Sequence, residues 1–174
     1  KRSSLRQEVG VVLQDPVLFG TSIKENIAYG KPGASMKEIE EAARQVHAHD
    51  FIVALPEGYD TLIAESGNTL SGGQRQRICL ARALIRQAAI LIMDEPTSAV
   101  DAQSHSLIRD AMSRLQQGRT ILLIAHQFHT IQDFDRILVL KNGTIIEDGD
   151  HTRLMQMKGY YYELYRLQNN LRVA

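Results

Sequence analysis

The sequence predicts an α/β fold in which helices flank a parallel sheet and a helical subdomain adjoins it. Short apolar runs at residues 89–94, 120–125 and 136–141 alternate with helical patterns, which is typical of a parallel sheet covered by helices. Residues 15–88 instead show helical patterns with little strand between them. At 174 residues and 44% apolar content, the chain is long and apolar enough to bury a core.

Hydrophobic spacing and capping residues place the individual elements. A strand is expected at residues 9–13, and helices are expected at 22–29, 35–48 and 71–87. The elements expected after these are strand 89–94, helix 101–117 capped by Asp101, strand 120–125, a short helix near 128–133, strands 136–141 and 144–148, and a final helix at about 152–170. Asn142-Gly143 predicts a hairpin between the last two strands. The tyrosines of the final helix are expected to pack rather than to bind bases.

The pentapeptide Leu70-Ser71-Gly72-Gly73-Gln74 predicts the start of a helix that can seat an anion. Ser71 and Gln74 have the spacing of a capping box, in which each side chain bonds the backbone N–H of the other residue. The first turn offers unpaired N–H groups and the positive end of the helix dipole, and the two glycines let a phosphate approach the backbone. The alternative is an ordinary capped helix after a tight turn.

The apolar run Ile90–Met93 ends in two carboxylates, Asp94 and Glu95. A run of this kind suits a strand buried on both faces, and ligands of open α/β sheets collect beyond the carboxyl ends of the strands. Asp94 is then placed to hold Mg²⁺, directly or through water, and Glu95 to take a proton from an attacking water. The alternative is a solvated acidic turn.

His126 follows another strand of the buried type, Ile121–Ala125, at the end where Asp94 and Glu95 are also expected to emerge. Its neutral ring could hydrogen-bond a terminal phosphate and hold the attacking water in place. The other histidines lie in polar or helical surroundings without metal-site spacing. Surface or capping roles are expected for His47, His49, His105, His129 and His151.

Five motifs in this order resemble those of the ATP-binding domain of ABC transporters. Leu70–Gln74 is similar to the signature motif of that family, and Ile90–Glu95 is similar to its Walker B strand with the adjacent catalytic glutamate. Ser98–Asp101 resembles the D-loop, His126 the switch histidine and Gln14 the glutamine of the Q-loop. The resemblance implies a P-loop NTPase-like fold, ATPase activity, and ATP and Mg²⁺ as cofactors.

The resemblance also implies a role for each motif residue. The implied catalytic residues are Glu95, His126 and Gln14, the implied metal ligands are Asp94 and Gln14, and the implied nucleotide-binding residues are Ser71, Gly72, Gly73, Gln74 and Asp101. In this family two ATPase domains face each other head to tail, and each ATP lies between the phosphate loop of one domain and the signature helix of the other. The signature residues would therefore serve the nucleotide of a second ABC ATPase domain.

Two further stretches resemble exporters rather than importers of that family. Thr61–Gly67, which contains Glu65, is similar to the loop that meets the intracellular helices of the membrane domain, and Ser22–Ile27 also fits the exporter pattern. The implied partners are a second ATPase domain and transmembrane domains, at the cytoplasmic face of a membrane. The longest apolar run, Ala88–Met93, is far shorter than the roughly 20 residues of a membrane-spanning helix. Membrane attachment is therefore expected through a partner or another segment.

A phosphate-binding loop is expected upstream of Gln14, and the 174 residues contain none. The nearest lookalike, Gly30-Lys31-Pro32, lacks the hydroxyl residue that should follow the lysine. The sequence is therefore expected to be a C-terminal portion of the ATPase domain. The expected regions are 1–14 with a strand and the Q-loop, 15–88 with the helical subdomain, 89–150 with the catalytic part, and 151–174 with a C-terminal helix. Alone, this portion is expected to be inactive and to expose apolar surface and unpaired strand edges.

Balanced charge argues against a role in binding nucleic acid. Twenty Lys and Arg residues offset twenty Asp and Glu residues, so no net field attracts nucleic acid or an anionic membrane. The single Cys79 lies among apolar residues and is expected to be a reduced core residue.

Two other functions stay open: a soluble ABC-type ATPase that acts on nucleic acid or ribosomes, and a non-catalytic remnant used for dimer contacts. Glu65 and its loop argue against the first, and the presence of Glu95 and His126 argues against the second.

Overall fold

The computed structural model divides the chain into two compact units, residues 1–124 and residues 125–174. In the first unit, helices lie beside a parallel sheet, and in the second, helices follow an antiparallel hairpin. The residues that the structure describes are 8–63, 70–95, 102–116 and 118–170.

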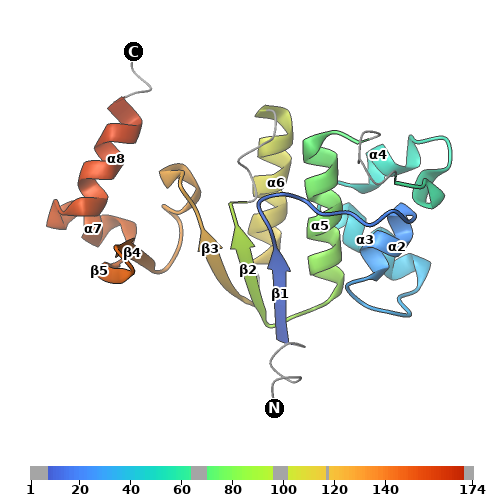
Figure 1. The fold of residues 1–174 in the computed structure, drawn as a ribbon, viewed down its shortest axis with the longest axis horizontal. Helices are drawn as coiled ribbons and strands as arrows, with labels where there is room; N and C mark the ends of the chain where they lie inside the picture. The colour runs from blue at the N-terminus through green and yellow to red at the C-terminus, as the bar shows by residue number, and fades with distance from the viewer. Residues whose placement is uncertain (1–7, 64–69, 96–101, 117, 171–174) are drawn as a thin grey trace. The chain divides into compact units, whose positions relative to one another are not determined.

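The sheet of the first unit consists, in the described residues, of parallel strands in the order β1-β2-β3 (Figure 1). Their bounds are Val9–Val12 for β1, Ile90–Asp94 for β2 and Thr120–Ile124 for β3. The register pairs Val12 with Met93, and Asp94 with Ile124. The parallel sheet that the sequence predicts is confirmed, and residues that follow its strands leave at the same edge.

One face of this sheet is covered by α5 (Gly72–Ile85) and α6 (Ala102–Leu115), as Figure 1 shows. Val12, Leu91 and Met93 point into the covered face and are at most 2% exposed. They share one apolar core with buried side chains of both helices. Burial of this apolar area is the main favourable term in the folding of the first unit.

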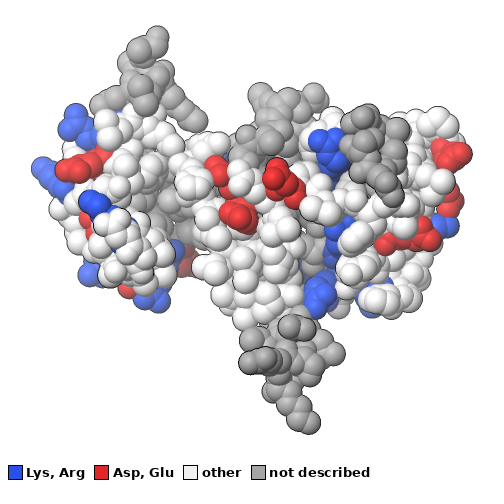
Figure 2. All heavy atoms as spheres, viewed as in Figure 1, with Lys and Arg blue, Asp and Glu red and all other residues white. Residues whose placement is uncertain are grey.

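The opposite face of the sheet is apolar and open. Val11, Ile92 and Leu122 form one row across the strands, and Val11 and Leu122 are 55% and 53% exposed. Figure 2 shows this face with few charged side chains over β1–β3, while acidic side chains gather at the carboxyl ends of the strands. The face matches the uncovered apolar surface that the sequence leads us to expect.

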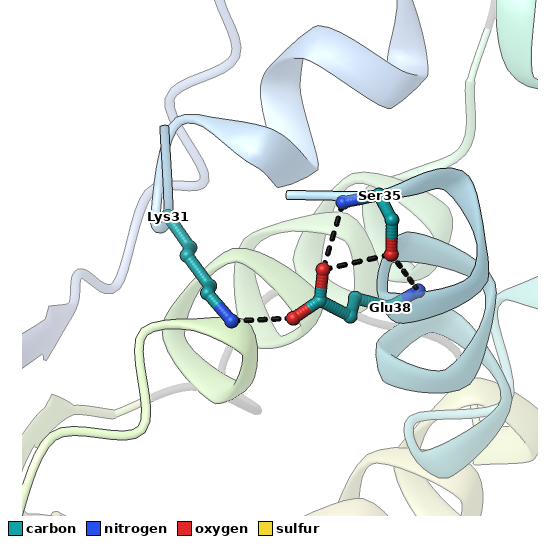
Figure 3. A network of polar contacts seen from close by, with 3 residues as sticks. All are labelled: Lys31, Ser35 and Glu38. Carbon is teal, nitrogen blue, oxygen red and sulfur yellow. Dashed lines mark hydrogen bonds and ion pairs between the residues drawn. The ribbon is translucent and has the colours of Figure 1, made fainter. Parts of the chain in front are cut away.

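The helical subdomain lies between β1 and β2 in the sequence. Its elements in chain order are α2 (Ile23–Ala28), α3 (Met36–Gln45), α4 (His49–Val53), the 3₁₀ turn η1 (Gly58–Asp60) and α5. Capping boxes start α2 at Ser22 and α3 at Ser35. The α3 cap is strengthened by Lys31, which pairs with the Glu38 carboxylate that also accepts from Ser35 (Figure 3).

Arg82 ties the start of the subdomain to α5. Its Nε donates to the carbonyl of Asn26 at 2.8 Å, and its Nη2 donates to Asn26 Oδ1 at 2.7 Å. Asn26 is fully buried, and its side chain also bonds the backbone of Phe19 in both directions. Burial lowers the pKa of Arg82, although an arginine stays protonated at any working pH. The segment that follows Gln14 is therefore fixed to α5.

The helix predicted at residues 35–48 is shorter in the structure, where α3 ends at Gln45 and α4 follows as a separate helix. His47 has a φ of +55°, which ends the helical run. Its carbonyl accepts a hydrogen bond from Arg77 Nη1 at 2.7 Å, and its Nε2 lies 2.5 Å from Asp110 Oδ2. Side chains of α5 and α6 thus stabilise a break that the local sequence does not indicate.

The second unit begins with the 3₁₀ turn η2 (Phe128–Thr130) and a hairpin of β4 (Ile137–Lys141) and β5 (Thr144–Gly149). Asn142 and Gly143 have φ values of +52° and +76°, as a tight hairpin turn requires, so the predicted hairpin is confirmed. The sequence also predicts that the strand at 136–141 belongs to the parallel sheet, and this prediction is wrong. In the described residues β4 pairs with β5 alone, in an antiparallel sheet.

The single final helix predicted at 152–170 is wrong, because the structure has α7 (His151–Met157) and α8 (Tyr160–Asn170) instead. Lys158 adopts the left-handed conformation at φ +51°. The Glu147 carboxylate caps α8 by accepting the N–H groups of Tyr160 at 2.6 Å and Tyr161 at 2.9 Å. A Cβ at Gly159 would overlap this carboxylate, so the break depends on a residue of β5.

Among the helices of the described residues, none is both long enough and apolar enough to span a membrane. Tyr161 is 1% exposed in the core of the second unit, with Ile137, Val139 and Leu154. The expectation that tyrosines of the final helix pack is confirmed for Tyr161. Cys79 on α5 is buried and reduced, and burial raises the pKa of its thiol.

Acid should weaken the α3 cap in a defined pH range. The hydrogen bond from Lys31, with those from Ser35, lowers the pKa of Glu38 from 4.5 to about 2. Ionised Glu38 therefore stabilises the fold fully above pH 4.5, and its contribution is lost as the pH falls from 4.5 to about 2. In urea unfolding across this range, we expect the free energy of unfolding of the Glu38→Gln variant to depend less steeply on pH than that of the wild type. The exposed Glu57→Gln is the control, and equal slopes for the two variants would contradict the prediction.

Candidate functional site

The helix α5 begins where the sequence predicts, at a capping box. Ser71 is the N-cap residue: its Oγ accepts the N–H of Gln74 at 3.2 Å, and Gln74 Oε1 accepts the N–H of Ser71 at 2.8 Å. These two bonds do not use the N–H groups of Gly72 and Gly73, which lie in the first turn of the helix. Ser71 is exposed, so an anion can reach this end of the helix.

The charge of this cap differs from that of the other two capping boxes. The third helical position is Glu25 in α2 and Glu38 in α3, whereas it is Gln74 in α5, which has no acidic residue in its first turn. A carboxylate at this position would repel a phosphate, whereas the amide of Gln74 adds no charge. The N-terminus of α5 is therefore capped and still electropositive.

Two arginines bond the signature stretch to its surroundings. Arg77 is buried, and it donates from Nε to the carbonyl of Gly73 at 3.2 Å and from Nη1 to the carbonyl of His47 at 2.7 Å. Arg75 Nη1 donates to the carbonyl of Leu70 at 2.5 Å. Backbone carbonyls on both sides of the cap are thus held in place. The sequence does not reveal the bond from Arg77 to His47, because no spacing pattern connects an arginine to a carbonyl thirty residues away.

Asp94 and Glu95 lie at the carboxyl end of β2, as predicted. The N–H of Glu95 extends the ladder between β2 and β3 by donating to the carbonyl of Ile124 at 2.9 Å. Glu95 has a φ of +35°, a conformation that costs a residue with a Cβ about 1–2 kcal/mol. Strain of this kind is concentrated at functional positions, and here it occurs where ligands of α/β sheets collect.

Gln14 is exposed and follows the end of β1 by two residues. Because Val12 pairs with Met93, the segment that carries Gln14 leaves the sheet beside the one that carries Asp94 and Glu95. The first unit thus brings three of the predicted site residues to one edge of the sheet.

The side chains at this edge fit a Mg²⁺ ion chemically. Mg²⁺ prefers oxygen ligands and keeps several waters when it is bound beside substrate phosphates. Asp94 offers a carboxylate oxygen and Gln14 an amide oxygen. In the described residues no group of three or more His, Cys, Asp or Glu side chains could hold a metal ion.

His126 belongs to the second unit and lies two residues beyond the end of β3. Its carbonyl accepts a hydrogen bond from Gln168 Nε2 at 2.8 Å, and the N–H of Phe128 donates to Gln168 Oε1 at 3.0 Å. A hollow of about 410 Å³ is lined by these three residues, Ala125 and two leucines of α8. His126 therefore lines an open surface of the second unit.

Other histidines have structural partners. His47 Nε2 bonds Asp110 of α6, as described above, and His49 Nδ1 lies 2.9 Å from Tyr59 Oη. His151 Nδ1 lies 2.8 Å from the hydroxyl of a buried tyrosine of α8. These three histidines are partly exposed, and each also joins its segment to another element of its unit.

The remaining sequence candidates divide into two groups. In the phosphate-loop lookalike, Gly30 is required by packing, since a Cβ there would overlap the carbonyl oxygen of Arg82. Asp101, the rest of the D-loop motif and Glu65 lie outside the described residues, so their roles stay predictions. Gln168 was not anticipated. Its position seven residues after Tyr161 places both residues on one face of α8, but this spacing does not reveal which segment Gln168 bonds.

Comparison with known proteins gives a consistent result. Residues 1–98 match the model of the ABC transporter family. The chain is 53% identical to an ATP-dependent lipid A-core flippase of Syntrophus aciditrophicus (strain SB), over 95% of this chain and 28% of that protein. It is 51% identical to the ABC transporter B family member 3 of Dictyostelium discoideum, over 95% of this chain and 12% of that protein.

A solved structure gives the same likeness in three dimensions. The structure of a bacterial Atm1-family ABC exporter with ATP bound matches with a TM-score of 0.90 and 43% identity, over 97% of this chain and 29% of that chain. The chain thus spans less than a third of the length of the relatives it matches.

The backbone conformation of Glu95 predicts that glycine at this position gives a more stable protein than alanine, the reverse of the order inside a helix. At φ +35° a Cβ is unfavourable, so Glu95→Gly should unfold with a free energy about 1 kcal/mol higher than Glu95→Ala. Arg44, which is exposed on α3, provides the control. There the unfolding free energy of the alanine variant should exceed that of the glycine variant by about 1 kcal/mol. Urea unfolding of the four variants measures both differences. An alanine variant at position 95 at least as stable as the glycine variant would show that the strain is absent in solution.

Proposed function

The chain belongs to the ABC transporter family and has the fold of an exporter-type nucleotide-binding domain, and we propose that it drives the export of a substrate across a membrane by ATP hydrolysis. The observation that carries the proposal is the single sheet edge at which Gln14, Asp94 and Glu95 emerge. The neutral capping box at Ser71 supports it, since it leaves an electropositive helix end for a nucleotide phosphate.

In the proposed reaction Glu95 is the general base. Its carboxylate accepts the proton of a water that attacks the terminal phosphate of ATP. Proton transfer of this kind typically raises the rate about 10²–10⁴-fold. Asp94 and Gln14 would hold Mg²⁺, which neutralises charge that develops on the phosphate oxygens. His126 would donate a ring hydrogen bond to the transferred phosphate and keep the attacking water in line.

The 174 residues contain no Gly-rich loop ending in Gly-Lys-Ser or Gly-Lys-Thr, the element whose amides and lysine hold the phosphates in this class of enzyme. We propose that these residues hydrolyse ATP only together with a segment that supplies such a loop. ATP bound by that loop would meet Glu95 of this chain.

The signature helix would act on a different nucleotide, one bound by a second ABC ATPase domain. The Ser71 hydroxyl uses its oxygen to accept the N–H of Gln74, so its own hydrogen can be donated to a phosphate. The N–H groups of Gly72 and Gly73 point the same way along the helix axis. Closure of two such domains over ATP would then depend on this helix end.

The surface proposed to contact transmembrane domains consists of two neighbouring segments of the helical subdomain, residues 17–21 and residues 62–63. The N–H of Ile63 donates to the carbonyl of Thr21 at 3.0 Å, which brings the two segments together. Exposed apolar side chains project from them, with Val17 at 56%, Phe19 at 38% and Leu62 at 67% exposure. Intracellular helices of the membrane domains would dock here, at the cytoplasmic face of the membrane.

Glu95→Gln tests the assignment of the base in the complete transporter chain proposed to contain this domain. The amide keeps the size of the side chain but cannot accept the proton, so turnover should fall by about 10²–10⁴ while ATP affinity stays nearly constant. ATP-loaded closed dimers should accumulate. Glu57→Gln removes the same charge in the helical subdomain and should leave turnover unchanged. A Glu95→Gln variant that loses affinity but keeps its turnover number would assign a structural role to this residue.

Ser71→Arg tests whether α5 serves the opposite nucleotide. The bulky cation blocks the helix end, so ATP-driven dimer closure should fail although ATP still binds the phosphate loop of the same chain. In dimers with one variant and one normal domain, only the site that faces the variant helix should be lost. Loss of the variant's own site instead would refute the assignment.

Gln74→Glu is the matched variant for the charge of the same helix end. A glutamate can form the same capping box as in α2 and α3, so the unfolding free energy should change by less than about 0.5 kcal/mol. The added carboxylate repels phosphate, and closure over ATP should require about tenfold more nucleotide, equivalent to about 1.4 kcal/mol.

A further inference from the structure

Gln168 on α8 bonds both ends of the short segment that carries His126. Its Nε2 donates to the His126 carbonyl at 2.8 Å, and its Oε1 accepts the Phe128 N–H at 3.0 Å. We propose that Gln168 is a positioning residue for His126, so that the C-terminal helix sets the orientation of this histidine during ATP hydrolysis. The inference rests on the proposed role of His126.

The backbone geometry explains why a carboxamide fits here. Gln127 is extended, with φ −107° and ψ +115°, and in an extended chain the carbonyl before a residue and the N–H after it point to the same side. Gln168 presents one donor and one acceptor in a single plane, as a neighbouring strand would. Both groups of the segment are therefore satisfied by one side chain, and rotation of the peptide units between them is restricted.

Aromatic packing fixes the register of α8 against this segment. The Phe128 ring meets Tyr161 edge-on at 5.0 Å between centroids, and it meets Tyr165 edge-on at 5.7 Å. Tyr161, Tyr165 and Gln168 are spaced by four and three residues, so they lie on one face of the helix. The two tyrosines hold α8 against Phe128, and Gln168 completes the same face one turn further on.

The arrangement has a functional consequence because a catalytic hydrogen bond is sensitive to small displacements. The Gln168 bond holds the carbonyl of His126, so the start of the histidine side chain is held with it. Without this bond, the backbone at His126 would be less restrained, and the position of the ring would change with it. Loss of Gln168 should then impair the chemical step and leave ATP affinity, which depends on other residues, unchanged.

Amide hydrogen exchange of the 174-residue chain tests the contact independently of activity. In Gln168→Leu, which keeps the size but removes both polar groups, exchange of the Phe128 N–H should accelerate at least tenfold relative to the wild type. Asn169→Leu is the matched control, since one residue advances the helix by about 100°, and it should leave this exchange unchanged. Equal protection in Gln168→Leu and the wild type would overturn the proposal.

Kinetics in the complete transporter chain test the effect on the reaction. We expect Gln168→Leu to lower kcat at least fivefold with an unchanged KM for ATP, whereas Asn169→Leu keeps both. Gln168→Glu keeps the acceptor for Phe128 but loses the donor to His126 at neutral pH. Protonation of the introduced carboxyl restores that donor, so its kcat relative to wild type should rise as the pH falls toward 5.

The outcomes separate this inference from the proposed function. If His126→Ala leaves kcat intact, the role of the histidine is wrong, whatever Gln168 does. If His126→Ala lowers kcat but Gln168→Leu does not, only the positioning role is wrong. A rise in KM with constant kcat in Gln168→Leu would also overturn it, because a general loss of structure would explain that result.

Discussion

Burial of α5 is the interaction on which the first unit depends. Its side chains are buried around most of its circumference, so the helix has neighbours on most sides rather than one apolar stripe. Ile78, Leu80 and Ala81 are fully buried, in one core with side chains of the sheet, α3 and α6. A helix enclosed in this way cannot shift without opening the core, so the donors at its N-terminus keep a fixed direction.

Two arginines of α5, Arg77 which is buried and Arg82 which is partly buried, bond segments outside the helix. Arg82 bonds the carbonyl and side chain of Asn26, and Arg77 bonds the carbonyl of His47. An unpaired buried charge is costly, so each arginine also requires its acceptors to stay in place. The segment around Asn26 and the break at His47 are thereby both held to α5.

The sequence predicts the features whose determinants lie within a few residues of each other. The cap of Ser71 by Gln74, the strand that ends at Asp94 and the turn at Asn142-Gly143 are of this kind, and all three are confirmed. The break at Lys158 has one local signal, Gly159, because glycine is unfavourable inside a helix. The contact that caps the second helix is not local, because the Glu147 carboxylate of β5 lies more than ten residues earlier.

The candidate site divides in the same way. The types and order of Gln14, Asp94, Glu95 and His126 are visible in the sequence, and their placement after strands follows from the α/β pattern. The positive φ of Glu95 leaves no trace in composition or periodicity, because any residue can follow a strand. The bonds of Gln168 are also invisible, since they join two segments about forty residues apart.

Comparison of the three capping boxes separates stability from function at the helix ends. Glu25 and Glu38 close their boxes with a carboxylate that the dipole of the helix also favours. At α5 the position is occupied by Gln74, which forms the same two hydrogen bonds but forgoes that electrostatic gain. Selection for stability alone would favour glutamate here as well. The amide instead leaves the helix end without a negative charge, as the proposed binding of a nucleotide phosphate requires.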